Sequence, residues 1–119
     1  MTHKTTPRHF AIFEREVRRL VKLWGLVDWE VRVRHDSLSN ALATCDPRAV
    51  SRICTIRLGK TWGPLDQVTD AAVLEAARHE VAHAVTGELI TVARARCVSE
   101  DELNEAIEVT ARRLGRMLP

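Results

Sequence analysis

The hydrophobic residues of the first segment recur three or four positions apart, which is the spacing of one face of an α-helix. Positions 10, 13, 17, 20, 21 and 24 follow this spacing. Thr6 has the side chain of a helix N-cap, Pro7 suits the first helical position, and Gly25 is a natural stop. The pattern therefore predicts a helix over residues 7–24.

The pattern then changes to strict alternation of apolar and polar residues over residues 28–34, which predicts a half-buried strand. Residues 41–45 and 53–58 predict two further strands. The Asp-Pro-Arg sequence at residues 46–48 has the chemistry of a turn between these two strands, and residues 59–64 predict a loop.

A second helical pattern starts at Thr69 or Asp70, either of which can cap it, and runs to about Thr86. Gly87 predicts the end of this helix. The apolar stripe of the helix contains Leu74, Ala77, Val81 and Val85. Residues 88–98 predict an irregular segment or one short strand.

The last helical pattern opens on a capping box, in which the side chains of Ser99 and Glu102 can each bond the backbone amide of the other residue. The positions expected to face inward are Leu103, Ala106, Ile107, Ala111 and Leu114. Together the elements predict an α+β fold in a single domain over residues 1–119. We expect an N-terminal helix, a small three-stranded, mostly antiparallel sheet, and two further helices.

Composition and charge narrow the class of protein. With 45% hydrophobic and 29% charged residues in 119 positions, the chain has the balance of a globular domain. Its net charge of +2 does not indicate a nucleic-acid partner. No apolar run is long enough to cross a membrane or to form a signal peptide, so we expect no membrane partner. The basic residues of the first helix are more typical of a solvated face; they are Arg8, Arg15, Arg18, Arg19 and Lys22.

The three cysteines, Cys45, Cys54 and Cys97, form no CxxC pair. This usage is typical of reduced, partly buried thiols in a cytoplasmic protein. A cross-strand bridge between Cys45 and Cys54 is the alternative interpretation.

The motif that carries chemistry lies in the second helical segment, at His79-Glu80-Val81-Ala82-His83. Two histidines four apart lie one helical turn above each other, so both imidazoles can bind one metal ion. Glu80 is placed to act as a general base on a water molecule at that metal. Because both histidines lie opposite the apolar stripe, we expect them to face a cleft. This HExxH pattern predicts a zinc site of the hydrolase type.

A catalytic zinc needs a third protein ligand besides the two histidines. The last helix offers five carboxylates as candidates: Glu100, Asp101, Glu102, Glu105 and Glu108. Helix capping occupies Glu102, and Glu100 lies in the first turn. Glu105 and Glu108 share one helix face, so their spacing alone does not separate them.

The helix sequence from His79 to Thr86 resembles the active-site helix of thermolysin-type proteases, including the Ala-Val-Thr after the second histidine. Leu103-Asn104-Glu105-Ala106-Ile107 is similar to the segment of that family's glutamate helix which carries the third zinc ligand. The resemblance covers roughly residues 79–108 and implies a gluzincin with Glu105 as the ligand. The family places an acidic residue four positions after this ligand, and here that position is Val109. This departure leaves Glu108 as the alternative third ligand.

The architecture resembles minigluzincins and the metallopeptidase domains of phage and mobile-element regulators. This implies a zincin-like minimal domain with an HExxH active-site helix and a C-terminal glutamate helix. It also implies a zinc metalloendopeptidase that binds one Zn²⁺ and cleaves a peptide or protein substrate, using metal-activated water and Glu80 as the general base. The strand over residues 53–58 would be the edge that pairs with an extended substrate. His35, at the end of the first strand, is the candidate for stabilising the oxyanion.

Two alternatives remain open at this point. One is a catalytically inactive zincin-fold module with a binding or regulatory role, which the absence of tyrosine and the departure at Val109 favour. The other is a regulator that uses the basic face of the first helix to bring a peptidase to nucleic acid.

Overall fold

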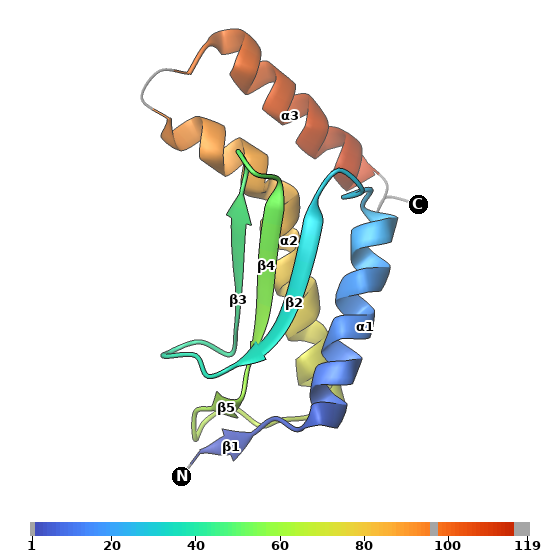
Figure 1. The fold of residues 1–119 in the computed structure, drawn as a ribbon, viewed down its shortest axis with the longest axis vertical. Coiled ribbons are helices and arrows are strands. Elements are labelled where there is room, and N and C mark those ends of the chain that lie inside the picture. Colours follow the sequence, from blue (N-terminus) through green and yellow to red (C-terminus); the bar gives the residue numbers. More distant parts are fainter. Residues whose placement is uncertain (1, 96–97, 116–119) are drawn as a thin grey trace.

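The computed structural model describes residues 2–95 and 98–115, in which three helices pack with a small sheet (Figure 1). The helices are α1 (Pro7–Leu23), α2 (Asp70–Arg94) and α3 (Glu100–Gly115). The strands are β1 (His3–Lys4), β2 (Glu30–Asp36), β3 (Ala43–Arg48), β4 (Ile53–Gly59) and β5 (Thr61–Trp62). The expected α+β class is confirmed. No helix within the described ranges is long and apolar enough to cross a bilayer.

The main sheet has three strands in the order β2-β4-β3 and is mixed in direction. β4 runs parallel to β2 and antiparallel to β3. The expectation of a mostly antiparallel sheet is therefore wrong, because an alternating pattern defines the two faces of a strand and not its partners. β4 is bonded on both sides, so the prediction that this strand offers a free edge to a substrate is also wrong. The free edges belong to β2 and β3.

The connection between β3 and β4 differs from the predicted turn at residues 46–48. Those residues continue β3, and the chain reverses at residues 49–52, where Arg52 has a φ of 58°. Pro47 is tolerated inside β3 because this strand lies at the edge of the sheet. It has no neighbouring strand on its free side, so the missing amide hydrogen removes no hydrogen bond there. The predicted loop at 59–64 contains β5, which pairs with β1.

The start and end of α1 follow the sequence prediction. The Thr6 side chain accepts a hydrogen bond from the His9 amide, and the His9 ring accepts one from the Thr6 amide, which together form a capping box. Pro7 occupies the first turn, and Gly25 has a φ of 71° just after the helix.

The core lies between the sheet and the helices α1 and α2, which cover the same face of the sheet (Figure 1). Alternate residues of β4 point into this core, whereas the residues between them are only half-buried. The largest fully buried side chains are Trp62, Phe13, Leu26, Ile56, Leu58, Val17, Val73, Val81, Val85 and Cys54. The apolar stripe of α2 therefore includes Val73 rather than the predicted Leu74.

α2 continues past its predicted end at Thr86 and replaces most of the irregular segment expected over 88–98; Cys97 lies outside the described residues. Gly87 is buried inside the helix and does not have the positive φ of a helix stop. A Cβ at Gly87 would lie 3.0 Å from the Cβ of Pro47. Glycine thus serves a close approach of α2 to β3, a packing role that local sequence does not distinguish from helix termination.

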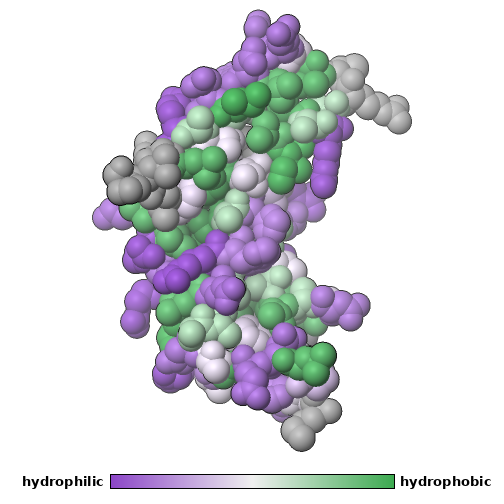
Figure 2. Space-filling view, turned by 180° about the vertical axis from the view of Figure 1, so that it is seen from behind, coloured by the Kyte–Doolittle hydropathy of each residue, from purple (hydrophilic) through white to green (hydrophobic). Residues whose placement is uncertain are grey.

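α3 begins as predicted, since the Ser99 hydroxyl accepts a hydrogen bond from the Glu102 amide. Its inward face is rotated from the predicted one. Ala106, Thr110 and Arg113 are buried, whereas Ile107 is 46% and Leu114 is 45% exposed. Arg113 is stabilised inside by its ion pair with Asp28, 3.3 Å away. Figure 2, which views the molecule from behind, shows hydrophobic residues gathered in the upper part of that surface.

A buried carboxylate joins α1 to α2 directly beside the HExxH motif. Glu16, only 7% exposed, receives hydrogen bonds from Arg19 at 2.7 Å and from Arg78 at 2.9 Å. The hydrogen bond from Arg19 and the charge of both guanidinium groups lower the pKa of Glu16, although burial opposes this change. Arg78 immediately precedes His79, so this ion pair links α1 to α2 next to the motif.

We expect Glu16→Gln to lower the free energy of unfolding by about 1 kcal/mol at pH 7, a modest value because both arginines are largely exposed. A lowered pKa stabilises the fold above the unfolded-state value near 4.5, and this contribution disappears as the pH falls through the folded-state value. Urea unfolding of both proteins at pH 7 and pH 3 measures it. An equal difference at the two pH values would contradict this account.

Candidate metal centre

α2 presents the HExxH motif with its two histidines in solvent and its glutamate inside. The side chain of Thr69 caps the helix by accepting a hydrogen bond from the Ala72 amide. Burial of Ala77, Val81 and Val85 against the core directs the opposite side of the helix outward. His79 and His83 lie on that side and are exposed, as the sequence predicted.

The two imidazoles converge on one point. Nε2 of His79 and Nε2 of His83 are 3.2 Å apart, and the rings meet edge to face. Two nitrogens that bind one tetrahedral zinc at Zn–N distances of 2.0–2.1 Å are separated by about 3.3 Å. The observed separation therefore already suits a shared metal ion.

Glu80 completes this group from the buried side of α2. It is 5% exposed, and burial raises the pKa of its carboxyl group, with the two histidines opposing this change. Within residues 2–95 and 98–115, only His79, Glu80 and His83 form a metal-binding group of three, with ligand atoms within 4.8 Å of one another. A raised pKa on a buried carboxyl group next to two imidazoles is typical of a site built for proton transfer.

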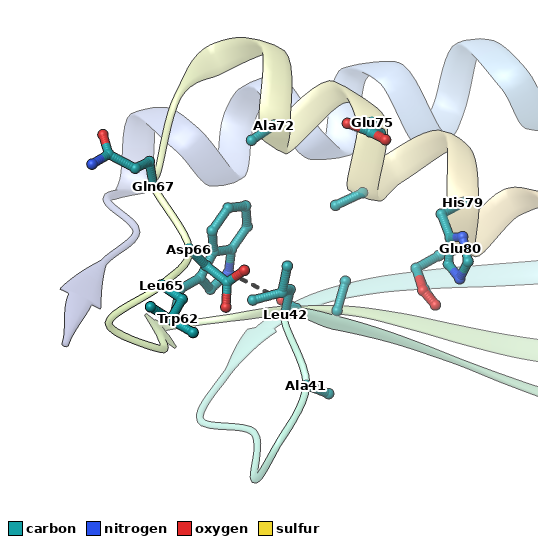
Figure 3. Close-up of a pocket in the computed structure, with 12 residues that line it drawn as sticks. Ala41, Leu42, Trp62, Leu65, Asp66, Gln67, Ala72, Glu75, His79 and Glu80 are labelled. Carbon is teal, nitrogen blue, oxygen red and sulfur yellow. Dashed lines mark hydrogen bonds between the residues drawn. The ribbon is translucent and has the colours of Figure 1, made fainter.

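A cleft of about 680 Å³ opens beside this group, between the first half of α2 and the segments that flank β3 and β5. His79 and Glu80 lie at one end of it, and Leu42 and Trp62 line the side facing α2 (Figure 3). The Trp62 ring nitrogen donates a hydrogen bond to the Leu42 carbonyl at 3.2 Å, which holds that wall in place.

Two carboxylates in this cleft were not identified from the sequence. Glu75 lies four residues before His79 on the same face of α2, and Asp66 precedes the helix (Figure 3). Helical spacing alone could have identified Glu75. Asp66, Leu42 and Trp62 reach the cleft only through the folding of distant segments, so no local pattern indicates them.

The predicted third ligands do not join the histidines in this arrangement. Glu105 and Glu108 are exposed on α3, and Glu105 lines a separate cleft together with Val92 and Arg52. Val92 is nine residues beyond His83, which corresponds to about 13 Å along the helix. The ligand role of either glutamate stays a prediction.

His35 makes its contacts outside the lining of the cleft. The Thr5 hydroxyl donates to the Gly59 carbonyl at 2.7 Å and therefore accepts from Nε2 of His35, also at 2.7 Å. The His35 ring stacks on Phe10, and burial lowers its pKa. Through these contacts His35 joins β2 to the start of α1. Its position gives no support to its predicted role in stabilising the oxyanion.

Comparison with models of protein families, with curated proteins and with solved structures gave no significant match for this chain.

We expect Glu80→Gln to stabilise the metal-free protein at pH 7 by on the order of 1 kcal/mol, because it removes a carboxylate whose charged form is disfavoured by burial. A raised pKa favours the fold below the unfolded-state value near 4.5, and this advantage is lost as the pH rises through the folded-state value. The gain should therefore vanish near pH 4. Thermal unfolding in the presence of a chelator measures it.

Glu75→Gln is the matched control, because Glu75 lies on the same helix but is exposed. Its effect should stay within about 0.5 kcal/mol at both pH values. A stability loss for Glu80→Gln at pH 7 would show that the carboxylate is satisfied in the folded protein.

Proposed function

We propose that this chain is a zinc-dependent metallopeptidase of the gluzincin type, built on a zincin-like minimal domain. His79 and His83 bind a single Zn²⁺, and Glu80 is the general base. The observation that carries the proposal is the convergence of the two Nε2 atoms at 3.2 Å beside a buried carboxylate, at the end of an open cleft.

The donor set favours zinc among the common metal ions. Imidazole nitrogens suit Zn²⁺, whereas Ca²⁺ and Mg²⁺ prefer oxygen ligands alone. Two exposed histidines leave coordination positions open towards the cleft, as a catalytic site requires. When bound, the zinc ion supplies a Lewis acid that polarises a carbonyl group and makes a water molecule more acidic.

The role of Glu80 follows from its burial and its place between the histidines. Its carboxylate accepts a proton from the attacking water and passes it to the nitrogen of the leaving amine. Burial raises the pKa of this carboxyl group, which brings its proton affinity closer to what a group that both takes and returns a proton needs.

The free edge of β3 is the surface on which an extended peptide would lie. β3 ends the sheet, and Ala43 at its start lines the same cleft as His79 and Glu80. A peptide paired with this edge would carry its side chains alternately into the cleft. Asp66 and Glu75 favour a basic side chain there.

The second candidate is a metal-binding module of the same fold without catalysis, with a binding or regulatory role such as the sequence resemblance to phage and mobile-element regulators implies. The position of Glu105 beside Val92 favours it, because a metal held by two histidines alone is weakly bound.

We expect the purified protein to bind one Zn²⁺, and His79→Ala or His83→Ala to weaken binding by about 100-fold or more, since each removes one of few ligands. Glu80→Gln should keep the zinc and reduce peptide cleavage by roughly 10²–10⁴-fold. Competition with a chromophoric chelator measures the affinity, and a peptide library measures cleavage. His3→Ala is the matched control and should change neither.

The outcomes separate the two candidates. Zinc binding that depends on both histidines, together with cleavage that depends on Glu80, supports the peptidase. Histidine-dependent zinc binding without cleavage supports the binding module. Zinc affinity that is unchanged in both histidine variants would contradict the proposed metal centre itself.

For the third ligand, we expect Glu105→Gln to lower zinc affinity by roughly tenfold or more, because it removes the carboxylate that the resemblance implies. Such a loss requires α3 to bring Glu105 nearer to the histidines when metal binds. Glu108→Gln is the control, three residues away on the same exposed face, and should leave the affinity unchanged. The reverse pattern would assign the ligand to Glu108, and two unaffected variants would exclude α3 from the site.

A further inference from the structure

Two cysteines lie side by side in the layer between the sheet and α2. Cys45 belongs to β3 and Cys54 to β4, and their Sγ atoms are 3.4 Å apart as free thiols. This separation is about 1.4 Å longer than a disulfide bond of ~2.05 Å. The two sulfurs are therefore in contact without being joined.

The register of the hairpin explains how they meet. Cys45 pairs with Ile56 and Cys54 pairs with Pro47, so the two cysteines face each other diagonally. Diagonal neighbours are typically about 7–8 Å apart at Cα, whereas a disulfide usually spans about 4.4–6.8 Å. A bond between them thus requires a small shift of one strand. β3 can supply it, because this edge strand is bonded to only one neighbour in the sheet.

The two thiols differ in exposure and in acidity. Cys54 is 1% exposed, whereas Cys45 is only half-buried and offers a route for a small reagent. A hydrogen bond from the Cys45 thiol lowers the pKa of Cys54, and the same bond raises the pKa of Cys45. Cys54 is therefore the more acidic of the two thiols, and the thiolate is the form from which thiol oxidation starts.

We propose that Cys45 and Cys54 form a reversible oxidation site, which hydrogen peroxide converts to an intramolecular disulfide. One thiolate attacks a peroxide oxygen, so that an S–O bond forms, the O–O bond breaks and hydroxide leaves. The second sulfur then attacks the sulfenic acid, so that the S–S bond forms and the S–O bond breaks. The two leaving hydroxides take up the two thiol protons as water. The sulfurs lose two electrons and the peroxide gains them.

The position of the pair links this oxidation to the motif. Ala43, two residues before Cys45, lines the cleft with Glu80, and Pro47, two residues after it, lies against Gly87 of α2. Closure of the disulfide therefore displaces the strand that forms one wall of the cleft. The oxidation site is independent of the proposed metal chemistry, because neither sulfur belongs to the histidine group.

The test uses the full chain with Cys97→Ser, which leaves the pair as its only thiols. After brief treatment with hydrogen peroxide, we expect the intact mass to fall by two hydrogen atoms and both thiols to resist alkylation once the treated protein is denatured. Arg48 and Arg52 lie between the cysteines, so trypsin separates them and a disulfide appears as two linked peptides. Dithiothreitol should restore both thiols. The reaction in folded protein should be roughly tenfold or more faster than in denaturant, because the fold holds the sulfurs in contact.

The matched control carries Cys97→Ser together with Cys54→Ser and should give no linked peptides. The proposal is overturned if peroxide treatment of the folded protein, under conditions that cross-link the denatured chain, leaves both thiols open to alkylation after denaturation. It is equally overturned if the two cysteines oxidise separately to sulfinic or sulfonic acids. The unsubstituted protein, measured in parallel, shows whether Cys97→Ser alters the reaction.

Discussion

The packing of α2 against α1 and the sheet is the constraint on which the remaining structure depends. The apolar stripe of this helix must be buried, because the side chains of Val73, Ala77 and Val81 are removed from water only when they pack against α1 and the sheet. Once this stripe is fixed, the helix has a single rotation about its axis. The histidines then face solvent and Glu80 points towards the sheet. The geometry of the candidate metal centre is therefore a consequence of hydrophobic burial on the other side of the same helix.

Two ion pairs add to this constraint on the rotation of α2. Glu16 bonds Arg78 immediately before the motif, and Arg8 pairs with Asp70 at the first turn of α2. Both pairs connect α1 to α2. Two of the basic residues of α1, Arg8 and Arg19, are thus engaged in ion pairs, which agrees with the interpretation of that surface as a solvated helix face.

The sequence was sufficient for those features that depend on local periodicity and local hydrogen bonds. The cap at Thr6, the stop at Gly25 and the exposure of the histidine pair all follow from residues within one or two helical turns. The sheet was less predictable, because alternation in β2 and β4 does not reveal that the two strands run parallel. The face of α3 was also missed, since a buried Arg113 is stable only with Asp28, a partner 85 positions away.

The same distinction applies to the candidate site. The spacing of the two histidines on one helix is fixed by the pitch of that helix, so the sequence alone predicted that their imidazoles converge. A third ligand on α3 depends on where that helix crosses α2, which no local pattern encodes. The lining of the cleft could not be predicted for the same reason, because Trp62 and Leu42 are 20 positions apart in the sequence and meet only through a hydrogen bond in the folded chain.

The close contact between Gly87 and Pro47 has a geometric consequence for the motif. A Cβ at position 87 would lie only 3.0 Å from the Pro47 Cβ, so any larger residue there would push α2 away from β3. His83 lies one turn before Gly87 and would move away from β3 together with the helix. The close approach of the histidine-bearing helix to β3 thus depends on the absence of a Cβ at position 87.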